Sequence, residues 1–107
     1  MQVTIYIGHN INDIPTLDTN TVLNEVMNTI HPEAFTTWEA AGYWNGTPEI
    51  TTIIQLNGQD PDSLPTLEQQ ISIAAHNLKQ YSIWFEVIEE HTAKEIKQLN
   101  NEIEMRA

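Results

Sequence analysis

An Asn-Gly pair at positions 45 and 46 separates two strand-like segments, and this feature constrains the fold more than any other. Residues 35–44 and 49–56 are rich in Thr, Ile and aromatic side chains, which favour β-strands. Asn-Gly between two such segments is the strongest short-range signal for a β-hairpin. We therefore predict two adjacent antiparallel strands, with Pro48 close enough to the turn to widen the loop.

Alternating apolar and polar residues predict one further strand near each end of the chain. Residues 2–7 (QVTIYI) and 82–90 (SIWFEVIEE) both show the two-residue period of a half-buried strand. Residues 9–18 are rich in Asn, Asp and Pro, a composition typical of a loop.

Two segments repeat apolar residues at helical spacing. The first is expected to begin at a cap formed by Asp18 or Thr19 and to end before Pro32, because the residue before proline avoids helical angles. The second is expected to begin at Ser63, with Pro65 tolerated in its first turn. The predicted buried faces are Leu23, Val26, Met27 and Ile30 in the first helix, and Leu67, Ile71, Ala74, Ala75 and Leu78 in the second.

The order of these elements, β-α-β-β-α-β, predicts a single α+β domain over residues 1–107 with a ferredoxin-like fold. Right-handed crossovers would place both helices on one face of a four-stranded antiparallel sheet and leave the other face open. Thr92 and Glu95 form a capping-box pattern, which predicts a C-terminal helical extension over residues 91–107.

Successive side chains of a strand point to opposite faces of the sheet. This alternation, here called strand parity, predicts which residues lie on the open face. A two-residue turn would pair Trp44 with Thr47 and Trp38 with Ile53, and directly paired residues share a face. The set expected to face the helices is Phe35, Thr37, Ala41, Tyr43, Ile50, Thr52, Ile54 and Leu56. The set expected on the open face, and interpreted as a binding surface, is Tyr6, Trp38, Trp44, Ile53, Trp84 and Ile88.

An uncovered aromatic surface of this kind is typical of a contact site. Three occupants fit it: the predicted C-terminal helix, a second copy of the chain, or a different partner. RNA-recognition domains also carry aromatic residues on an open sheet face. Here the first Lys or Arg is Lys79, so the charge disfavours nucleic acid.

Fifteen acidic residues outweigh four basic ones and give a net charge of −11. Such a surface repels phosphate groups and anionic lipid, so we predict no direct nucleic-acid binding and no membrane binding. It attracts a basic protein surface, although net charge also simply keeps a protein in solution. The acidic surface residues singled out are Asp13, Asp18, Glu25, Glu39, Glu49, Asp60 and Asp62.

Motifs for catalysis or metal binding are not recognisable in the sequence. The four histidines, His9, His31, His76 and His91, have no metal-binding spacing. Glu89, Glu90 and His91 are adjacent along a predicted strand, so their side chains alternate between faces and do not converge. We therefore predict no catalytic residue, no metal site and no cofactor. The lack of cysteine, of a signal peptide and of an apolar run of ~20 residues predicts a cytoplasmic protein.

Short motifs in residues 3–56 resemble a family of small bacterial and phage proteins of unknown function. The matching residues are Ile7, Gly8, Gly42, Trp44, Gly46 and Glu49. The resemblance implies a ferredoxin-like fold and no particular activity. The loop after Gly8 differs from the family pattern, and the predicted terminal helix is not part of it.

Two functions of different classes fit these observations. The first is a non-enzymatic, homodimeric, acidic protein-binding domain, such as a phage or mobile-element inhibitor whose carboxylates mimic nucleic-acid phosphates in a basic groove. The alternative is a small-molecule-binding or enzymatic dimer that encloses a pocket at its open sheet faces. A third and simpler hypothesis is a structural subunit whose aromatic face only joins protomers.

Overall fold

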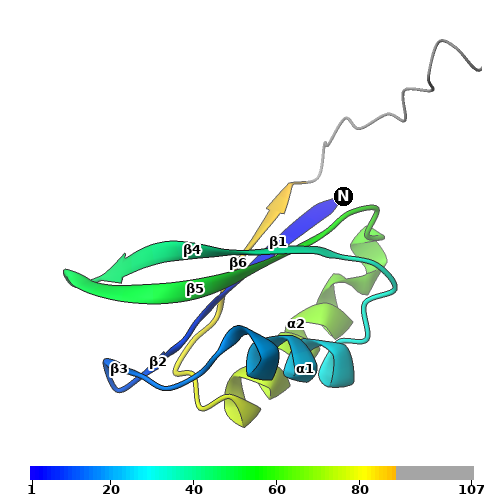
Figure 1. Ribbon diagram of the computed structural model, residues 1–107. Coiled ribbons are helices and arrows are strands. Elements are labelled where there is room, and N and C mark those ends of the chain that lie inside the picture. The colour runs from blue at the N-terminus through cyan, green and yellow to red at the C-terminus, as the bar shows by residue number, and fades with distance from the viewer. Residues whose placement is uncertain (89–107) are drawn as a thin grey trace, which may run out of the picture.

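The computed structural model describes residues 1–88, and the predicted extension over residues 91–107 lies outside them. Figure 1 shows the arrangement of the described elements. They are β1 (Gln2–Gly8), β2 (Asn10–Ile11), β3 (Ile14–Pro15), α1 (Thr19–Thr29), β4 (Thr36–Trp44), β5 (Thr47–Leu56), the 3-10 turn η1 (Pro61–Ser63), α2 (Leu64–Asn77) and β6 (Trp84–Ile88). No helix among these residues is long and apolar enough to cross a membrane.

A four-stranded antiparallel sheet forms one layer of the protein, and α1 and α2 form the other (Figure 1). The strand order is β4-β5-β1-β6, and β1 pairs antiparallel with both β5 and β6. A mixed α+β architecture with two helices on one side of the sheet, predicted from the sequence, is confirmed. The other side is not covered by any helix among the described residues.

The β4–β5 turn fixes the register of the hairpin. Asn45 and Gly46 both have positive φ, 48° and 79°, as a type I′ turn requires. Trp44 pairs with Thr47 and Trp38 pairs with Ile53, so the predicted register is confirmed. Pro48 does not widen the loop. It lies inside β5, where type I′ geometry directs its missing N–H away from β4.

The core lies between the sheet and the two helices. Val3, Ile5 and Ile7 of β1 are fully buried together with Ile54 and Leu56 of β5. The helices contribute Val22, Val26, Ile30, Leu67, Ile71 and Leu78 to the same cluster. The side chains that β1 and β5 bury here are aliphatic and mostly β-branched, and such side chains pack well on a pleated surface, which explains why the helices cover this face rather than the aromatic one.

The buried face of α1 differs in part from the prediction. Val22 and Val26 are buried, Leu23 is half-buried, and Met27 is 46% exposed. The helix begins at Thr19, one residue after the Asp18 cap, and Val22, one turn before Val26, lies at the centre of the buried face in place of Met27. Helices bury a stripe about 100° wide, and Met27 lies at its rim.

The start of α2 is also more elaborate than predicted. The 3-10 turn η1 precedes the helix, and Ser63 stands at the N-cap position without capping it. Its hydroxyl instead donates to the carbonyl of Asp60, whose side chain caps η1 by accepting from the N–H of Asp62. Pro65 lies in the first turn of α2, as predicted.

The expected loop over residues 9–18 contains a short hairpin. β2 and β3 pair through Asn10–Pro15 and Ile11–Ile14, around Asn12 and Asp13, which both have positive φ. Asn and Asp tolerate the left-handed region better than other non-glycine residues. The segment predicted as a loop therefore contains a short hairpin that the sequence pattern did not predict.

The outer half of the β4–β5 hairpin projects beyond the helical layer (Figure 1). Within β5, only Thr51–Leu56 pairs with β1, so residues 41–50 form a two-stranded extension, here called the hairpin arm. Tyr43 and Ile50 have the parity of the helix-facing side but are exposed, Tyr43 to 73%. The prediction that Ala41, Tyr43 and Ile50 are covered by helices is wrong, because the helices do not reach the hairpin arm.

Candidate binding face of the sheet

A row of large side chains crosses all four strands on the face opposite the helices. Trp38 pairs with Ile53, Ile53 with Tyr6, and Tyr6 with Trp84. These four residues are called the aromatic row. Trp84 is 73% exposed and Trp38 is 43% exposed, whereas Ile53 between them is buried. The row therefore exposes two indoles to solvent, one on each side of Ile53 and Tyr6.

The other two residues of the predicted binding surface do not join the aromatic row. Trp44 lies on the same face at the end of the hairpin arm, six residues from Trp38 and therefore about 20 Å along the strand. Ile88 pairs with Gln2 at the opposite end of the sheet and is exposed. The structure brings together four of the six residues and leaves two at the margins of the face.

Tyr6 is fixed in the aromatic row by Glu86. The Tyr6 hydroxyl donates a hydrogen bond to Glu86 Oε1. This bond raises the pKa of Tyr6 above its usual value, and burial and the negative charge of Glu86 act in the same direction. Tyr6 therefore stays protonated and anchored, with its ring beside Trp84.

Small residues lie beside the aromatic row on the same face. Ala40 and Gly8 flank Thr51 on neighbouring strands, and Gly42 pairs with Glu49 one step further along. The carboxylate of Glu49 lies against the backbone of Gly8, where a Cβ atom would collide with Glu49 Oε1. We call these five residues the carboxylate patch.

The Glu49 carboxylate is held in place by the backbone of β2. Glu49 Oε2 accepts a hydrogen bond from the N–H of Asn10 at 2.9 Å. A charged acceptor strengthens such a bond, and the glycine at position 8 leaves room for it. Sequence reasoning assigned Glu49 only to the acidic surface. The pair of Gly8 and Glu49 within the short family-like motif was the available signal for this arrangement.

His9 has a structural position on the helix side of the sheet. Its Nε2 lies 2.6 Å from Thr52 Oγ1, and both residues are buried. Its backbone carbonyl accepts from the N–H groups of Thr16 and Leu17, which ties the start of α1 to β1. The pair satisfies its own hydrogen bonds, as buried polar groups require. Among residues 1–88, no group of three or more His, Asp or Glu is placed to hold a metal ion.

The acidic residues singled out from the sequence are spread over several elements. Asp18 caps α1 by accepting from the N–H of Thr21 at 2.8 Å, and this bond lowers the pKa of Asp18 below its usual value. Glu25 accepts from Thr29, and Glu39 accepts from Thr19. Asp60 caps η1, while Asp13 lies in the β2–β3 turn and Asp62 within η1. Most of these carboxylates therefore also stabilise local structure.

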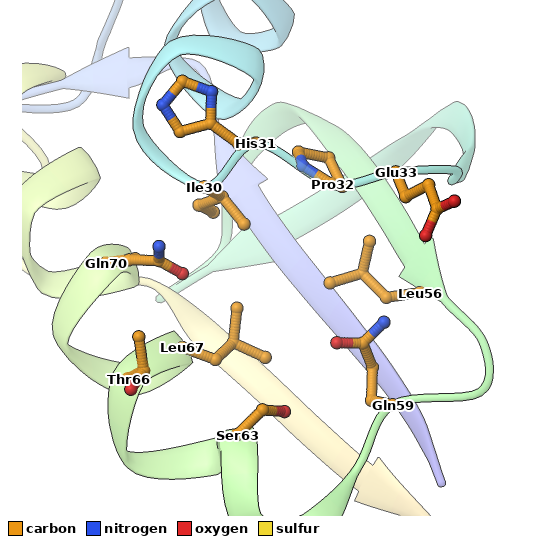
Figure 2. A pocket seen from close by; sticks show the side chains of 10 residues that line it. All are labelled: Ile30, His31, Pro32, Glu33, Leu56, Gln59, Ser63, Thr66, Leu67 and Gln70. Atoms are coloured by element: carbon orange, nitrogen blue, oxygen red, sulfur yellow. The ribbon is translucent and has the colours of Figure 1, made fainter.

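A separate cavity lies on the helical side, where α1 ends and α2 begins (Figure 2). Its volume is about 260 Å³. It is lined by Ile30, His31, Pro32, Glu33, Leu56, Gln59, Ser63, Thr66, Leu67 and Gln70. It contains none of the residues predicted to bind, and its polar rim surrounds an apolar floor formed by core residues.

No protein-family model and no curated protein sequence matches the chain. Solved structures do match. A phage SAM lyase in its apo state covers 85% of this chain and 91% of its own, with a TM-score of 0.58 and 12% identity. A phage SAM lyase in complex with S-methyl-5′-thioadenosine covers 78% and 76%, with a TM-score of 0.54 and 16% identity. A DUF3240 family protein from Shewanella baltica covers 88% and 96%, with a TM-score of 0.49 and 12% identity.

At these identities the likeness to the two lyase structures shows a shared fold alone, because one fold serves many functions. The two lyases are phage proteins, and the resemblance of this chain to small bacterial and phage proteins stays a prediction.

Proposed function

We propose that this chain is a non-enzymatic, acidic protein-binding domain that contacts its partner through the open face of the sheet. The observation that carries the proposal is the aromatic row. Trp84 and Trp38 are exposed on either side of Tyr6 and Ile53, on a face without a helix among the described residues. Burying such indoles stabilises a complex strongly, since Trp and Tyr dominate binding hot spots.

We further propose that the fold is ferredoxin-like and that the chain forms a homodimer. The strand order β4-β5-β1-β6 supports the fold assignment, because a ferredoxin-like sheet has its first strand between the third and fourth. A helix after β1 and another after β5 agree with it.

The partner proposed for the open face is a protein with a basic surface. Residues 1–78 contain no Lys or Arg, so most of the described surface attracts cations and repels phosphate. An inhibitor carried by a phage or mobile element would fit this chemistry. Its carboxylates would take the place of nucleic-acid phosphates in a basic groove, and it would bind neither nucleic acid nor membrane itself.

The test is direct binding to a panel of purified nucleic-acid-binding proteins by calorimetry, with duplex DNA as competitor. We expect at least one member to bind, DNA to compete, and affinity to fall as salt rises from 50 to 500 mM. Trp84→Ala and Trp38→Ala should each weaken binding about tenfold or more. Tyr81→Ala is the matched control, because Tyr81 is a fully exposed aromatic residue outside the sheet. Binding that ignores salt, or tryptophan variants that bind like the wild type, would refute the proposal.

A second candidate function is a small-molecule site at the carboxylate patch. The specific observation is the Glu49 carboxylate, held against Gly8 beside the aromatic row. A carboxylate on the same sheet face as exposed indoles suits a planar ligand with a positive charge. A structural neighbour with S-methyl-5′-thioadenosine bound shares the fold, which supports testing SAM and this nucleoside as ligands.

Tryptophan fluorescence titrations with SAM and with S-methyl-5′-thioadenosine distinguish the two candidates. Under the small-molecule reading, one of them binds, and Glu49→Gln weakens the binding of the charged ligand more than that of the neutral one. Consumption of SAM, followed by mass spectrometry, would add an enzymatic activity. Unchanged fluorescence with both compounds would leave only the protein-binding proposal.

A further inference from the structure

The outermost strand of the sheet, β4, is paired on one side only. All nine residues of Thr36–Trp44 pair with β5. The type I′ turn makes Trp44 and Thr47 a hydrogen-bonded pair, so the even-numbered residues of β4 direct their N–H and C=O groups toward β5. The odd-numbered residues direct theirs outward. No strand of the described part of the chain lies on that side.

The outer edge of β4 lacks the features that normally protect a sheet edge. Natural edges are very short or carry Pro, Lys or a bulge. β4 has neither Pro nor Lys, is nine residues long, and pairs with β5 without a bulge. The opposite edge, β6, has only five residues. The one charged side chain of β4, Glu39, accepts a hydrogen bond from Thr19 near the start of α1.

We propose that β4 of a second copy of this chain occupies the edge, in an antiparallel two-fold pairing centred on Ala40. The odd-numbered residues of the two strands then exchange hydrogen bonds, and the two sheets become one continuous eight-stranded sheet. The inference rests on the homodimer proposed above but not on the basic partner. It names the dimer contact, which includes Trp38 of the aromatic row and leaves Ile53, Tyr6 and Trp84 free.

The side chains of β4 are self-complementary on the open face in this register. Trp38 lies opposite Gly42 of the partner subunit, and Trp44 lies opposite Thr36 of the partner subunit. Each indole therefore meets a small residue, and packing of an aromatic ring over a cross-strand glycine stabilises strand pairs.

The same register also avoids a clash of charges on the other face. Glu39 lies opposite Ala41 of the partner subunit, so no carboxylate is directly opposite another. Tyr43 lies opposite Thr37 of the partner subunit. A chain of net charge −11 repels its own copy, and β4 brings only one carboxylate from each chain, Glu39, to the contact.

The first test compares Ala41→Pro with Ala41→Thr by sedimentation velocity over a range of concentrations. Ala41 is odd-numbered, so proline removes an outward N–H and spares the pairing with β5. Threonine keeps the N–H and favours a strand. We expect the wild type and Ala41→Thr to dimerise, Ala41→Pro to dimerise at least tenfold more weakly, and Trp84→Ala on the open face to dimerise like the wild type.

Amide hydrogen exchange of the wild type provides a readout that needs no variant. The N–H groups of Glu39 and Ala41 face outward, so their protection should rise with protein concentration, whereas that of Ala40 should not change. A wild type that stays monomeric at all concentrations refutes both this inference and the proposed homodimer. Dimerisation that persists in Ala41→Pro, or that Trp84→Ala abolishes, refutes the edge contact alone.

Discussion

At the residue scale, the contact between Gly8 and Glu49 makes a sharp prediction. Gly8→Ala places a Cβ where the Glu49 carboxylate lies. The end of this flexible side chain can move, so we expect a fold that survives with a loss of about 1 kcal/mol, the contribution of the hydrogen bond from Asn10. The amide signal of Asn10 in an NMR spectrum should shift strongly.

A double-mutant cycle is the control for this contact. A Glu49→Ala background lacks the carboxylate that the new Cβ would meet, so Gly8→Ala should lower the free energy of unfolding, measured with urea, much less there. Equal costs in the two backgrounds would mean that the substitution at position 8 acts through the backbone and not through the carboxylate.

The Asp18 cap predicts a pH dependence of stability. Because the N–H of Thr21 lowers the pKa of Asp18 below 3.8, the charged form stabilises the fold above pH 3.8. That stabilisation is lost as the pH falls through the lowered, folded-state pKa. Asp18→Asn can still cap but does not titrate. The stability advantage of the wild type over Asp18→Asn, measured by urea unfolding, should therefore shrink as the pH falls from neutral to below the usual pKa of an Asp side chain. An advantage that grows on acidification would contradict the assigned cap.

At the scale of the elements, α1 offers a test of which face is buried. Val26 is fully buried and its neighbour Met27 is 46% exposed. Val26→Ala should lower the free energy of unfolding by about 2 kcal/mol through lost burial and a residual cavity. Met27→Ala should change it by no more than about 0.5 kcal/mol. Chemical denaturation of the two variants measures both changes. Similar decreases in the free energy of unfolding at both positions would contradict the observed orientation of the helix.

The elements that sequence patterns predicted are those in which local and tertiary signals agree. Asn45-Gly46 gave the correct turn and register because only a type I′ geometry suits both residues, and two-residue periodicity then fixed the face of every strand residue. The β2–β3 hairpin was missed because two-residue strands leave no periodic pattern. The exposure of Tyr43 was also missed, since parity gives the face of a residue but not how far the neighbouring layer extends.

The sequence predicted the aromatic row of the candidate site but not the contacts of Glu49. Strand parity placed Tyr6, Trp38, Ile53 and Trp84 on one face, and cross-strand pairing then forms them into a row. The carboxylate patch was not predictable, because it depends on the chain after Gly8 continuing beside β5, where the N–H of Asn10 donates to Glu49. Contacts of this kind arise from loop geometry, which carries a weak sequence signal.

At the scale of the whole molecule, the net charge of −11 gives the two proposed contacts opposite salt dependences. Binding of a basic protein gains from Coulomb attraction and weakens as salt screens it, whereas pairing of two acidic chains is opposed by repulsion and strengthens with salt. We therefore expect the dimer of this chain to tighten between 50 and 500 mM salt while partner binding loosens, as measured by sedimentation and calorimetry. Both affinities moving in the same direction would show that one of the two contacts is assigned wrongly.

Accessibility of the three indoles connects the open face to the assembly as a whole. Trp84 and Trp44 are 73% and 68% exposed and Trp38 is 43% exposed, so in variants that retain a single tryptophan the fluorescence of the first two should be quenched more readily by acrylamide. Iodide should quench all three less well than caesium, because the acidic surface repels anions. If the dimer forms through β4, quenching of Trp84 should be the same in monomer and dimer, since Trp84 lies on β6 at the opposite edge of the sheet. If quenching of Trp84 is lost on dimerisation, the second copy lies on the open face instead. If Trp84 resists quenching even in the monomer, the chain covers this face itself and leaves no free surface for a partner.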